Sequence, residues 1–237
     1  MGSDRDHWTR VADQWIAWAR TPGHDAFWAY REALRAFVGP GSGPALEVGC
    51  GEGRVSRLLR ELGYRVTATD VSPALIDAAR GADSADDYHL APATSLPFAD
   101  GSFDIAVAYN VLMDVEDVPG VVRELRRVLR ADGTLVVSIV HPLADLVHLD
   151  DAGRPVAGDT YFGRTRFEGS EERGGLRMEF AGWSQPLEAY AMAMEAARFA
   201  ITALREPVPD AAGGNLERWT RLPLFLWLKA RPFGDAG

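Results

Sequence analysis

The chain of 237 residues has little of several features that would otherwise guide its interpretation. It holds a single cysteine, Cys50, which excludes a disulfide framework and a cysteine-based zinc site. Lys229 is its only lysine, and 25 basic residues against 34 acidic ones give a net charge of −9. This charge argues against nucleic-acid and anionic-membrane partners, because both are bound through basic patches. We therefore expect neither kind of partner.

Long apolar runs are also missing from the sequence. No stretch approaches the ~18 uncharged apolar residues that indicate a transmembrane helix. The first residues, MGSDRDHW, lack the apolar segment of a signal peptide, so we expect a cytoplasmic protein. The five histidines show no spacing with carboxylates that would indicate a metal site. The 47% of hydrophobic residues indicates an ordinary globular chain.

Two amphipathic helices are expected in the first forty residues. Apolar residues recur at helical spacing from Trp8 to Ala19 and again from Phe27 to Val38, with Pro22-Gly23 between the two runs. A Gly/Pro stretch from Gly39 to Pro44 follows. This pattern predicts a helical N-terminal cap over residues 1–44 and a core over residues 45–237.

From Ala45 onward, short apolar strands alternate with amphipathic helices. Buried strands in such an alternation indicate a parallel sheet with helices on both faces. The alternation stops after Pro142, and residues 142–185 form an insert that contains one hairpin strand around Leu176–Phe180. The expected strands are residues 45–49, 64–70, 88–91, 103–109, 134–140, 199–204 and 224–230, and the expected core helices are residues 55–62, 73–80, 118–129 and 187–197.

The strongest motif is the segment Glu47-Val-Gly49-Cys-Gly51-Glu-Gly53-Arg54, which leaves a strand and enters a helix. Glycines let the backbone turn tightly and approach a ligand. The spacing is G-x-G-x-G, whereas a dinucleotide fingerprint reads G-x-G-x-x-G. The two acids beside the loop would repel a pyrophosphate. They suit a ligand with positive charge, such as S-adenosylmethionine with its sulfonium and ammonium groups.

The segment ALEVGCGEGR resembles motif I of the class I S-adenosylmethionine-dependent methyltransferases. The resemblance extends through Asp70 at the end of the second strand, LPFADGSFD at residues 96–104 and RELRRVLRADGTLVVS at residues 123–138. It covers roughly residues 45–140. It implies a seven-stranded, doubly wound, mostly parallel sheet of the Rossmann-like methyltransferase type, here with the helical cap and with a lid insert after strand five.

The same resemblance implies roles for residues of the glycine loop and of the second strand. Gly49, Gly51 and Gly53 form the turn under the methionine part of the cofactor, and Glu47 lies near its ammonium group. Asp70 accepts hydrogen bonds from both ribose hydroxyls, since one carboxylate can bind two adjacent donors. An alternative for Asp70 is the capping of the next helix.

Two further cofactor contacts follow from the resemblance, and one of them departs from the family pattern. Asn110 is expected beside the methionine part, with a turn position as the alternative. Many family members place an acid against the adenine amino group after strand three, where this chain has Pro92. Proline offers no side-chain acceptor and no N–H, so adenine recognition falls to the backbone around Ala93 and Thr94, or to nearby side chains.

Three more residues are candidates at the reacting end of the site. His141 ends the fifth strand and is a candidate general base, because its pKa suits proton transfer near neutral pH. The alternative is a histidine that holds the turn before Pro142. Trp15 and Arg20 lie on an N-terminal helix that could close over the cofactor, with Arg20 paired to the cofactor carboxylate. The alternative is a tryptophan core stripe with a solvated arginine.

The predicted function is methyl transfer to a small-molecule acceptor, with a secondary metabolite as the expected class. The insert carries Tyr161, Phe162, Phe167, Phe180 and Trp183, which suits a small apolar or aromatic acceptor. These aromatics could instead form the core of the hairpin or a homodimer contact. Two other functions stay open: an enzyme of this fold that uses the cofactor for a reaction other than methylation, and a non-catalytic cofactor-binding module.

Overall fold

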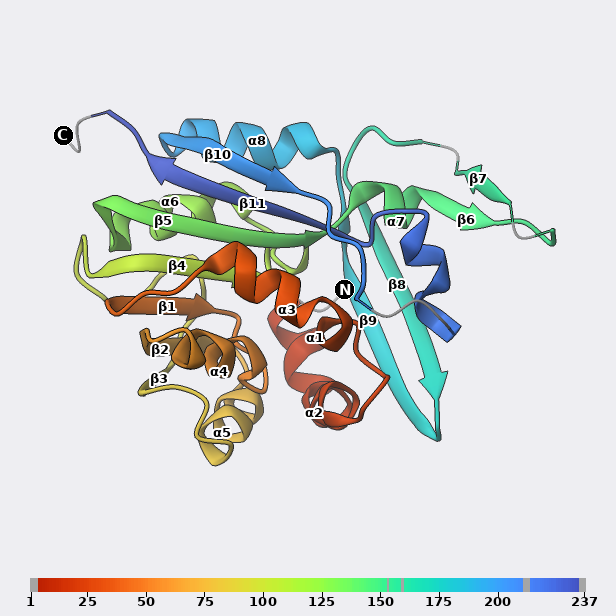
Figure 1. The fold of residues 1–237 in the computed structure, drawn as a ribbon, viewed down its shortest axis with the longest axis horizontal. Coiled ribbons are helices and arrows are strands. Elements are labelled where there is room, and N and C mark those ends of the chain that lie inside the picture. Colours follow the sequence, from red (N-terminus) through yellow and green to blue (C-terminus); the bar gives the residue numbers. More distant parts are fainter. Residues whose placement is uncertain (1–3, 153, 159, 211–213, 235–237) are drawn as a thin grey trace.

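The main element of the fold is a seven-stranded sheet with the strand order β10-β11-β5-β4-β1-β2-β3 (Figure 1). The computed structural model describes residues 4–152, 154–158, 160–210 and 214–234. Strand β11 is antiparallel to both of its neighbours, and the remaining pairs are parallel. The predicted mostly parallel sheet is therefore confirmed. The strands are β1 (Pro44–Val48), β2 (Arg65–Asp70), β3 (Asp87–Leu90), β4 (Phe103–Tyr109), β5 (Leu129–Val140), β10 (Phe199–Arg205) and β11 (Phe225–Pro232).

Helices cover both faces of this sheet. On one face α6 (Val118–Val128) and α8 (Leu187–Ala196) pack against alternate strand residues such as Leu46 and Val48. On the other face α3, α4 and α5 pack against the residues between them, such as Ala45. Successive side chains of a strand point to opposite faces, so the near-continuous apolar strands serve both layers. The bounds of these three helices are Phe27–Val38, Arg54–Glu61 and Pro73–Gly81.

The N-terminal segment contains three helices, where the sequence pattern predicted two. Helices α1 (Asp4–Arg10) and α2 (Ala12–Arg20) lie beside the carboxyl end of the sheet, as Figure 1 shows. Helix α3 belongs to the core, because Tyr30 is fully buried and its ring lies 5.0 Å from that of Phe225. The hydrophobic core therefore crosses the expected boundary at residue 44. None of the described helices is long and apolar enough to span a membrane.

The insert over residues 142–185 forms two small sheets apart from the main one. Helix α7 (Pro142–Leu146) leads into β6 (Val147–Leu149) and β7 (Pro155–Ala157), and the longer hairpin pairs β8 (Thr165–Arg173) with β9 (Leu176–Ser184). The hairpin turn, Gly174-Gly175, has φ of 56° and 79°, the left-handed region that a tight hairpin turn needs. The hairpin extends along α1 and α2 in Figure 1.

A partly buried network of hydrogen bonds and ion pairs joins two of the sequence motifs on the α6 face. The Glu124 carboxylate accepts the Leu96 N–H at 2.8 Å, and Arg127 donates to the main-chain oxygens of Leu96 and Phe98 at 3.0 and 2.7 Å. Arg127 also pairs with Asp100 and Glu124. These contacts satisfy the backbone of the loop between β3 and β4, which has no ladder partner of its own.

We expect Arg127→Leu to lower the free energy of unfolding by about 2–3 kcal/mol, because charged hydrogen bonds to loop carbonyls are lost. Urea denaturation measures the change. Arg123→Leu is the matched control: its nearest acid, Asp117, is 4.0 Å away and both side chains are exposed, so the change should stay within about 0.5 kcal/mol. Equal changes in the free energy of unfolding for the two substitutions would contradict a stabilising role of the Arg127 contacts.

Candidate functional site

A cavity of about 720 Å³ lies at the carboxyl ends of β1, β2 and β4. In an open α/β sheet, ligands bind at the point where the strand order reverses, which here is between β1 and β4. Helix α2 and the β8–β9 hairpin supply the opposite wall. The predicted residues that line this cavity are Trp15, Glu47, Gly49, Gly51, Asp70, Ala93 and Asn110.

The glycine loop takes a backbone conformation that other residues rarely adopt. Gly49, Gly51 and Gly53 have φ of 63°, 55° and 91°. A Cβ atom on Gly49 would lie 2.5 Å from Val111 Cγ2, and one on Gly53 would lie 2.1 Å from Ser84 Oγ. Gly49 and Gly51 line the cavity, whereas Gly53 lies behind it at the start of α4. The loop therefore needs glycine both for its dihedral angles and for its close packing.

Asp70 ends β2 with its carboxylate buried in the cavity wall. One carboxylate oxygen accepts the Gly51 N–H and the other accepts the Ser72 N–H, each at 2.9 Å. Burial raises the pKa of this carboxyl. An ionised carboxylate can accept about four hydrogen bonds, so these two leave capacity for a ligand. The contact with Ser72 also satisfies a backbone N–H at the N-terminus of α5, which is the capping role left open by the sequence.

Glu47 is the second buried acid of the cavity. Its side chain leaves β1 toward α4, where the Ser56 hydroxyl donates to it. Burial raises the pKa of Glu47 to about 8, and the nearby Arg54 charge opposes that rise. A carboxyl in this environment gains from a cationic ligand, because the positive charge replaces the hydration that the carboxylate has lost.

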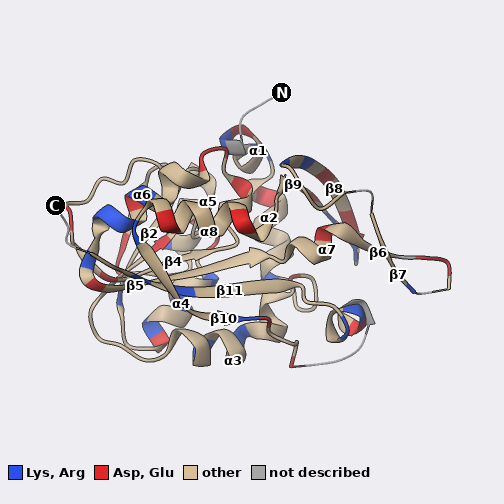
Figure 2. Cartoon of the chain, turned by 90° about the horizontal axis from the view of Figure 1, so that it is seen from above, with Lys and Arg blue, Asp and Glu red and all other residues tan. Residues whose placement is uncertain are grey.

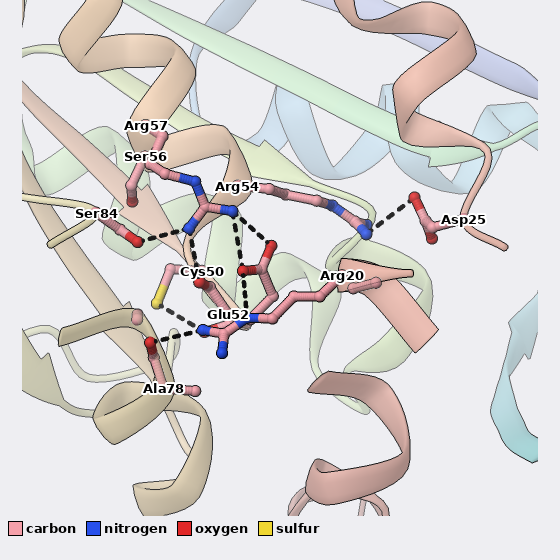
Figure 3. A network of polar contacts seen from close by, with 12 residues as sticks. Arg20, Asp25, Cys50, Glu52, Arg54, Ser56, Arg57, Ala78 and Ser84 are labelled. Atoms are coloured by element: carbon pink, nitrogen blue, oxygen red, sulfur yellow. Dashed lines mark hydrogen bonds and ion pairs between the residues drawn. The ribbon is translucent and has the colours of Figure 1, made fainter. Parts of the chain in front are cut away.

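Arg20 lies away from the cavity, in a network that is drawn in Figure 3. It donates to the Glu52 carboxylate at 3.3 Å and to the Ala78 main-chain oxygen at 2.9 Å. Arg57 holds the same carboxylate through two bonds of 3.0 and 2.9 Å. Glu52 is thus neutralised by arginines. Arg20 is therefore not among the residues that line the cavity, because its guanidinium group is bound to Glu52.

Arg54 is the cavity arginine that the sequence reasoning missed. It is buried, pairs with Asp25 at 2.9 Å and lies over the rings of Trp15 and Phe27, at 4.6 and 5.1 Å from their centres. The available signal was its position directly after Gly53, at the first turn of α4. Trp15 also contacts the glycine loop, since its Nε1 lies 3.0 Å from where a Cβ on Gly51 would be.

The predicted adenine and methionine contacts separate in the structure. Ala93 and the preceding Ala91 line the cavity, whereas Thr94 is exposed and lies outside the lining. Asn110 lines the cavity and also occupies a turn, with φ of 55°. Its side-chain oxygen accepts the Ser138 hydroxyl at 2.7 Å. Asn110 therefore occupies the turn position that was the alternative, and its contact with the methionine part of a cofactor stays a prediction.

His141 does not line the cavity, which removes the geometric basis for a general base at this position. Its Nδ1 accepts the Leu143 N–H at 3.0 Å, which caps α7, so the proton sits on Nε2 and is donated to Glu206 at 3.0 Å. Burial lowers the pKa of the imidazole. The geometry supports the alternative role, a histidine that holds the turn before Pro142.

The far half of the cavity is formed by the insert and by the segment before β11. Phe167 and Phe180 line it, whereas Phe162 is exposed and Tyr161 accepts the Leu187 N–H through its hydroxyl. Asp145, in α7, is a lining acid that the sequence reasoning missed. Its only sequence signal was its place four residues after His141, at the end of the fifth strand.

Comparison with known proteins finds similarity to methyltransferases. A family model described as "Methyltransferase domain" matches residues 46–137. A malonyl-(acyl-carrier protein) O-methyltransferase of Serratia marcescens is 36% identical over 116 residues, which are 49% of this chain and 45% of that protein. The chain thus matches about half the length of this curated relative.

Solved structures extend the likeness over most of the chain. An S-adenosylmethionine-dependent methyltransferase from Mesorhizobium loti is 28% identical, with a TM-score of 0.69 over 87% of this chain and 98% of the other. The cyclase SpnF shares the fold at a TM-score of 0.62 and 21% identity, covering 98% of each chain. The sequence motifs, the sheet order, the family match and these neighbours agree: residues 46–137 match a methyltransferase domain, and the chain has the fold of the S-adenosylmethionine-dependent methyltransferases.

Proposed function

We propose that this protein binds S-adenosylmethionine in the cavity and transfers its methyl group to a small-molecule acceptor. One observation carries the proposal: the left-handed glycine loop, Glu47 and Asp70 converge on a single cavity. The donor set fits this cofactor, because buried carboxyls suit its ammonium group and its ribose hydroxyls, and the glycines leave room for its chain.

Each part of the cofactor has candidate partners in this chain. Glu47 would hold the ammonium group, Asp70 the ribose hydroxyls, and the backbone of Ala91 and Ala93 the adenine. When bound, S-adenosylmethionine supplies a methyl group that its sulfonium sulfur makes electrophilic. The protein aligns the acceptor with that methyl group and excludes water, and alignment alone can contribute ~7–11 kcal/mol.

The β8–β9 hairpin and α2 act as the cover of the site in this proposal. The Trp18 and Phe180 rings meet at 6.1 Å, and Gln14 accepts the Glu179 N–H at 3.1 Å, so the two elements close over the cavity together. The family match ends at residue 137, before the insert that lines the far half. For this reason we propose a free small molecule as acceptor, and not the malonyl-(acyl-carrier protein) of the curated relatives. By analogy with the family, we also propose that the acceptor is a secondary metabolite and that the protein is cytoplasmic.

Asp70→Asn tests the cofactor site directly. S-adenosylhomocysteine should bind the native protein with a Kd on the order of 1 µM in calorimetry, and NAD should not bind. The substitution should weaken binding at least about tenfold, because charge-assisted bonds to the ribose are lost. Asp77→Asn, an exposed acid on the neighbouring α5, is the matched control. Native affinity in Asp70→Asn, or NAD binding in place of S-adenosylhomocysteine, would overturn the proposal.

Glu47 should make cofactor affinity depend on pH. Its carboxyl is largely protonated below about 8, and the ammonium group of the ligand favours the ionised form. S-adenosylhomocysteine should therefore bind more tightly as pH rises toward about 8. Without ligand, the folded state holds a proton that the unfolded chain loses near 4.5, so stability should fall as pH rises from 4.5 to about 8.

Calorimetry across this pH range measures the pH dependence of S-adenosylhomocysteine affinity, and urea denaturation measures the pH dependence of stability. Glu47→Gln should flatten both dependences, because the substituted side chain does not titrate. If the native protein and Glu47→Gln show the same pH dependence of S-adenosylhomocysteine affinity, Glu47 does not hold the ammonium group.

His141 should act on stability and not on cofactor binding. His141→Ala removes the cap of α7 and should lower the free energy of unfolding by about 0.5–2 kcal/mol. His141→Asn keeps a capping acceptor and should recover most of this loss. Because the pKa of His141 is lowered in the folded state, the stability that the neutral imidazole contributes is fully present above pH 6.5. It is lost as the pH falls through the pKa of the folded state. An unchanged stability in both variants would show that the capping contact is irrelevant.

A further inference from the structure

The far half of the cavity differs chemically from the cofactor half. Its walls come from the hairpin, from α7 and from the segment that precedes β11, and most of the side chains there are apolar or aromatic. The 720 Å³ of the whole cavity lie within the ~300–1,000 Å³ of ligand sites for small molecules. The apolar wall residues of this half are Ala144, Phe167, Phe180, Leu216, Trp219 and Leu224.

Asp145, in α7, is an acidic side chain that lines this half of the cavity. Its carboxylate accepts the Ser184 hydroxyl, and among the residues that the structure describes no arginine or lysine pairs with it. The residue as a whole is exposed and lines the cavity, while partial desolvation of its carboxylate raises its pKa to about 6. The group is thus mostly ionised at neutral pH and most of its lone pairs face no protein donor.

The two arginines of this half have their guanidinium groups fixed to the wall. Arg173 donates to the main-chain oxygens of Gly23 and His24 at 3.0 and 2.8 Å. Arg218 donates to the main-chain oxygen of Val147 at 3.0 Å and lies 4.1 Å from the centre of the Trp219 ring. These groups hold the hairpin and the segment before β11 in place. An anionic ligand would have to displace the Arg173 contacts, whereas Arg218 Nε is buried and has no hydrogen-bond partner among the described residues.

A second acid lines the cavity. Asp114, after β4, has its Oδ1 2.9 Å from where a Cβ on Gly182 would be. Burial is the main cause that raises the pKa of Tyr190; the charges of Asp145 and Asp114 also raise it and the charge of Arg164 lowers it, so acids and an arginine both lie near this ring. The ribbon of the β8–β9 hairpin carries both acidic and basic residues, which are coloured red and blue in Figure 2.

We propose that the acceptor is a small organic amine with an aromatic or apolar body, which Asp145 binds in its ammonium form. Because an ammonium ion has no lone pair, the nitrogen passes one proton to the Asp145 carboxylate before it forms the bond to the methyl group that leaves the sulfonium sulfur. The inference rests on the proposed methyltransferase function, because the cofactor then fills the half at β1 and β2 and leaves this half to the acceptor. A cation regains in the Asp145 carboxylate the interaction that it loses with water, and the aromatic walls take the apolar body. A carboxylate acceptor would instead meet Asp145 and Asp114 with like charge.

Matched probes of opposite charge test this assignment. Tryptamine and indole-3-propionate share the ring and the chain length, as do phenethylamine and 3-phenylpropionate. Binding is measured by ligand-observed NMR at neutral pH, with the protein saturated by S-adenosylhomocysteine. Each amine should bind at least about tenfold more tightly than its carboxylate partner. Asp145→Asn should abolish that preference, whereas Asp77→Asn, an exposed acid outside the cavity, should keep it.

Three results would overturn the assignment. They are carboxylates that bind as tightly as the amines, an amine affinity that Asp145→Asn leaves unchanged, and an absence of binding for both amines. Circular dichroism and an unchanged S-adenosylhomocysteine affinity show that Asp145→Asn is folded. The calorimetric titration with S-adenosylhomocysteine alone is done first. Its failure would count against the proposed function, whereas its success with no amine preference counts only against the acceptor class.

Discussion

The hydrogen bond from the Gly51 N–H to the Asp70 carboxylate connects the two turns on which the cavity depends. One turn follows β1 and the other follows β2, and each would otherwise leave buried polar groups without a partner. Because the bond needs the Gly51 N–H to point at β2, it also needs the left-handed dihedral angles of the loop. The glycine spacing and the acid at the end of β2 are thus two halves of one local structure, separated by 19 residues of sequence.

The buried acids show that the cavity is built at some expense of stability. Glu47 and Asp70 are both removed from water, and their raised pKa values report the unfavourable environment. Glu52, in the same loop, is buried as well, but Arg57 and Arg20 satisfy it. Glu52 therefore serves the structure of the loop, whereas Glu47 and Asp70 can still accept hydrogen bonds from a ligand. Functional sites commonly keep such unfavourable groups, because the ligand relieves them.

Much of the core was predictable from the sequence because its signals are local. The apolar run of β4 was expected over residues 103–109 and is found there, and the periodic helix before Asp132 was located within one residue. The glycine loop was recognisable since few residues tolerate its dihedral angles. Strand β8 was not predicted, because its sequence TRFEGSEER shows no alternation and both of its faces are largely exposed.

The site residues that were misplaced depend on contacts that no local pattern encodes. Arg20 was expected at the ligand, but Glu52, 32 residues away, binds it instead. His141 was a candidate base because it ends a strand, yet Glu206 and the Leu143 N–H occupy both of its ring nitrogens. Asp145 is the opposite case, a lining residue that was not predicted. Helix α7 places it at the cavity, whereas the sequence alone shows only an acid in a short segment. Tertiary partners decide the role of a polar side chain more than its type does.

The contacts between α2 and the hairpin have a consequence for the order in which this chain assembles. Gln14 meets Glu179 across 165 residues, and His24 meets Arg173 across 149. During synthesis the N-terminal helices emerge first, and they must wait for most of the chain before their partner exists. Until then Trp18 lacks the Phe180 and Arg173 side chains that pack against it, and the nascent chain presents this apolar side chain to its surroundings. Closure of the cavity is therefore a late event in the maturation of the protein, and chaperone binding to the N-terminal helices would be strongest before the hairpin leaves the ribosome.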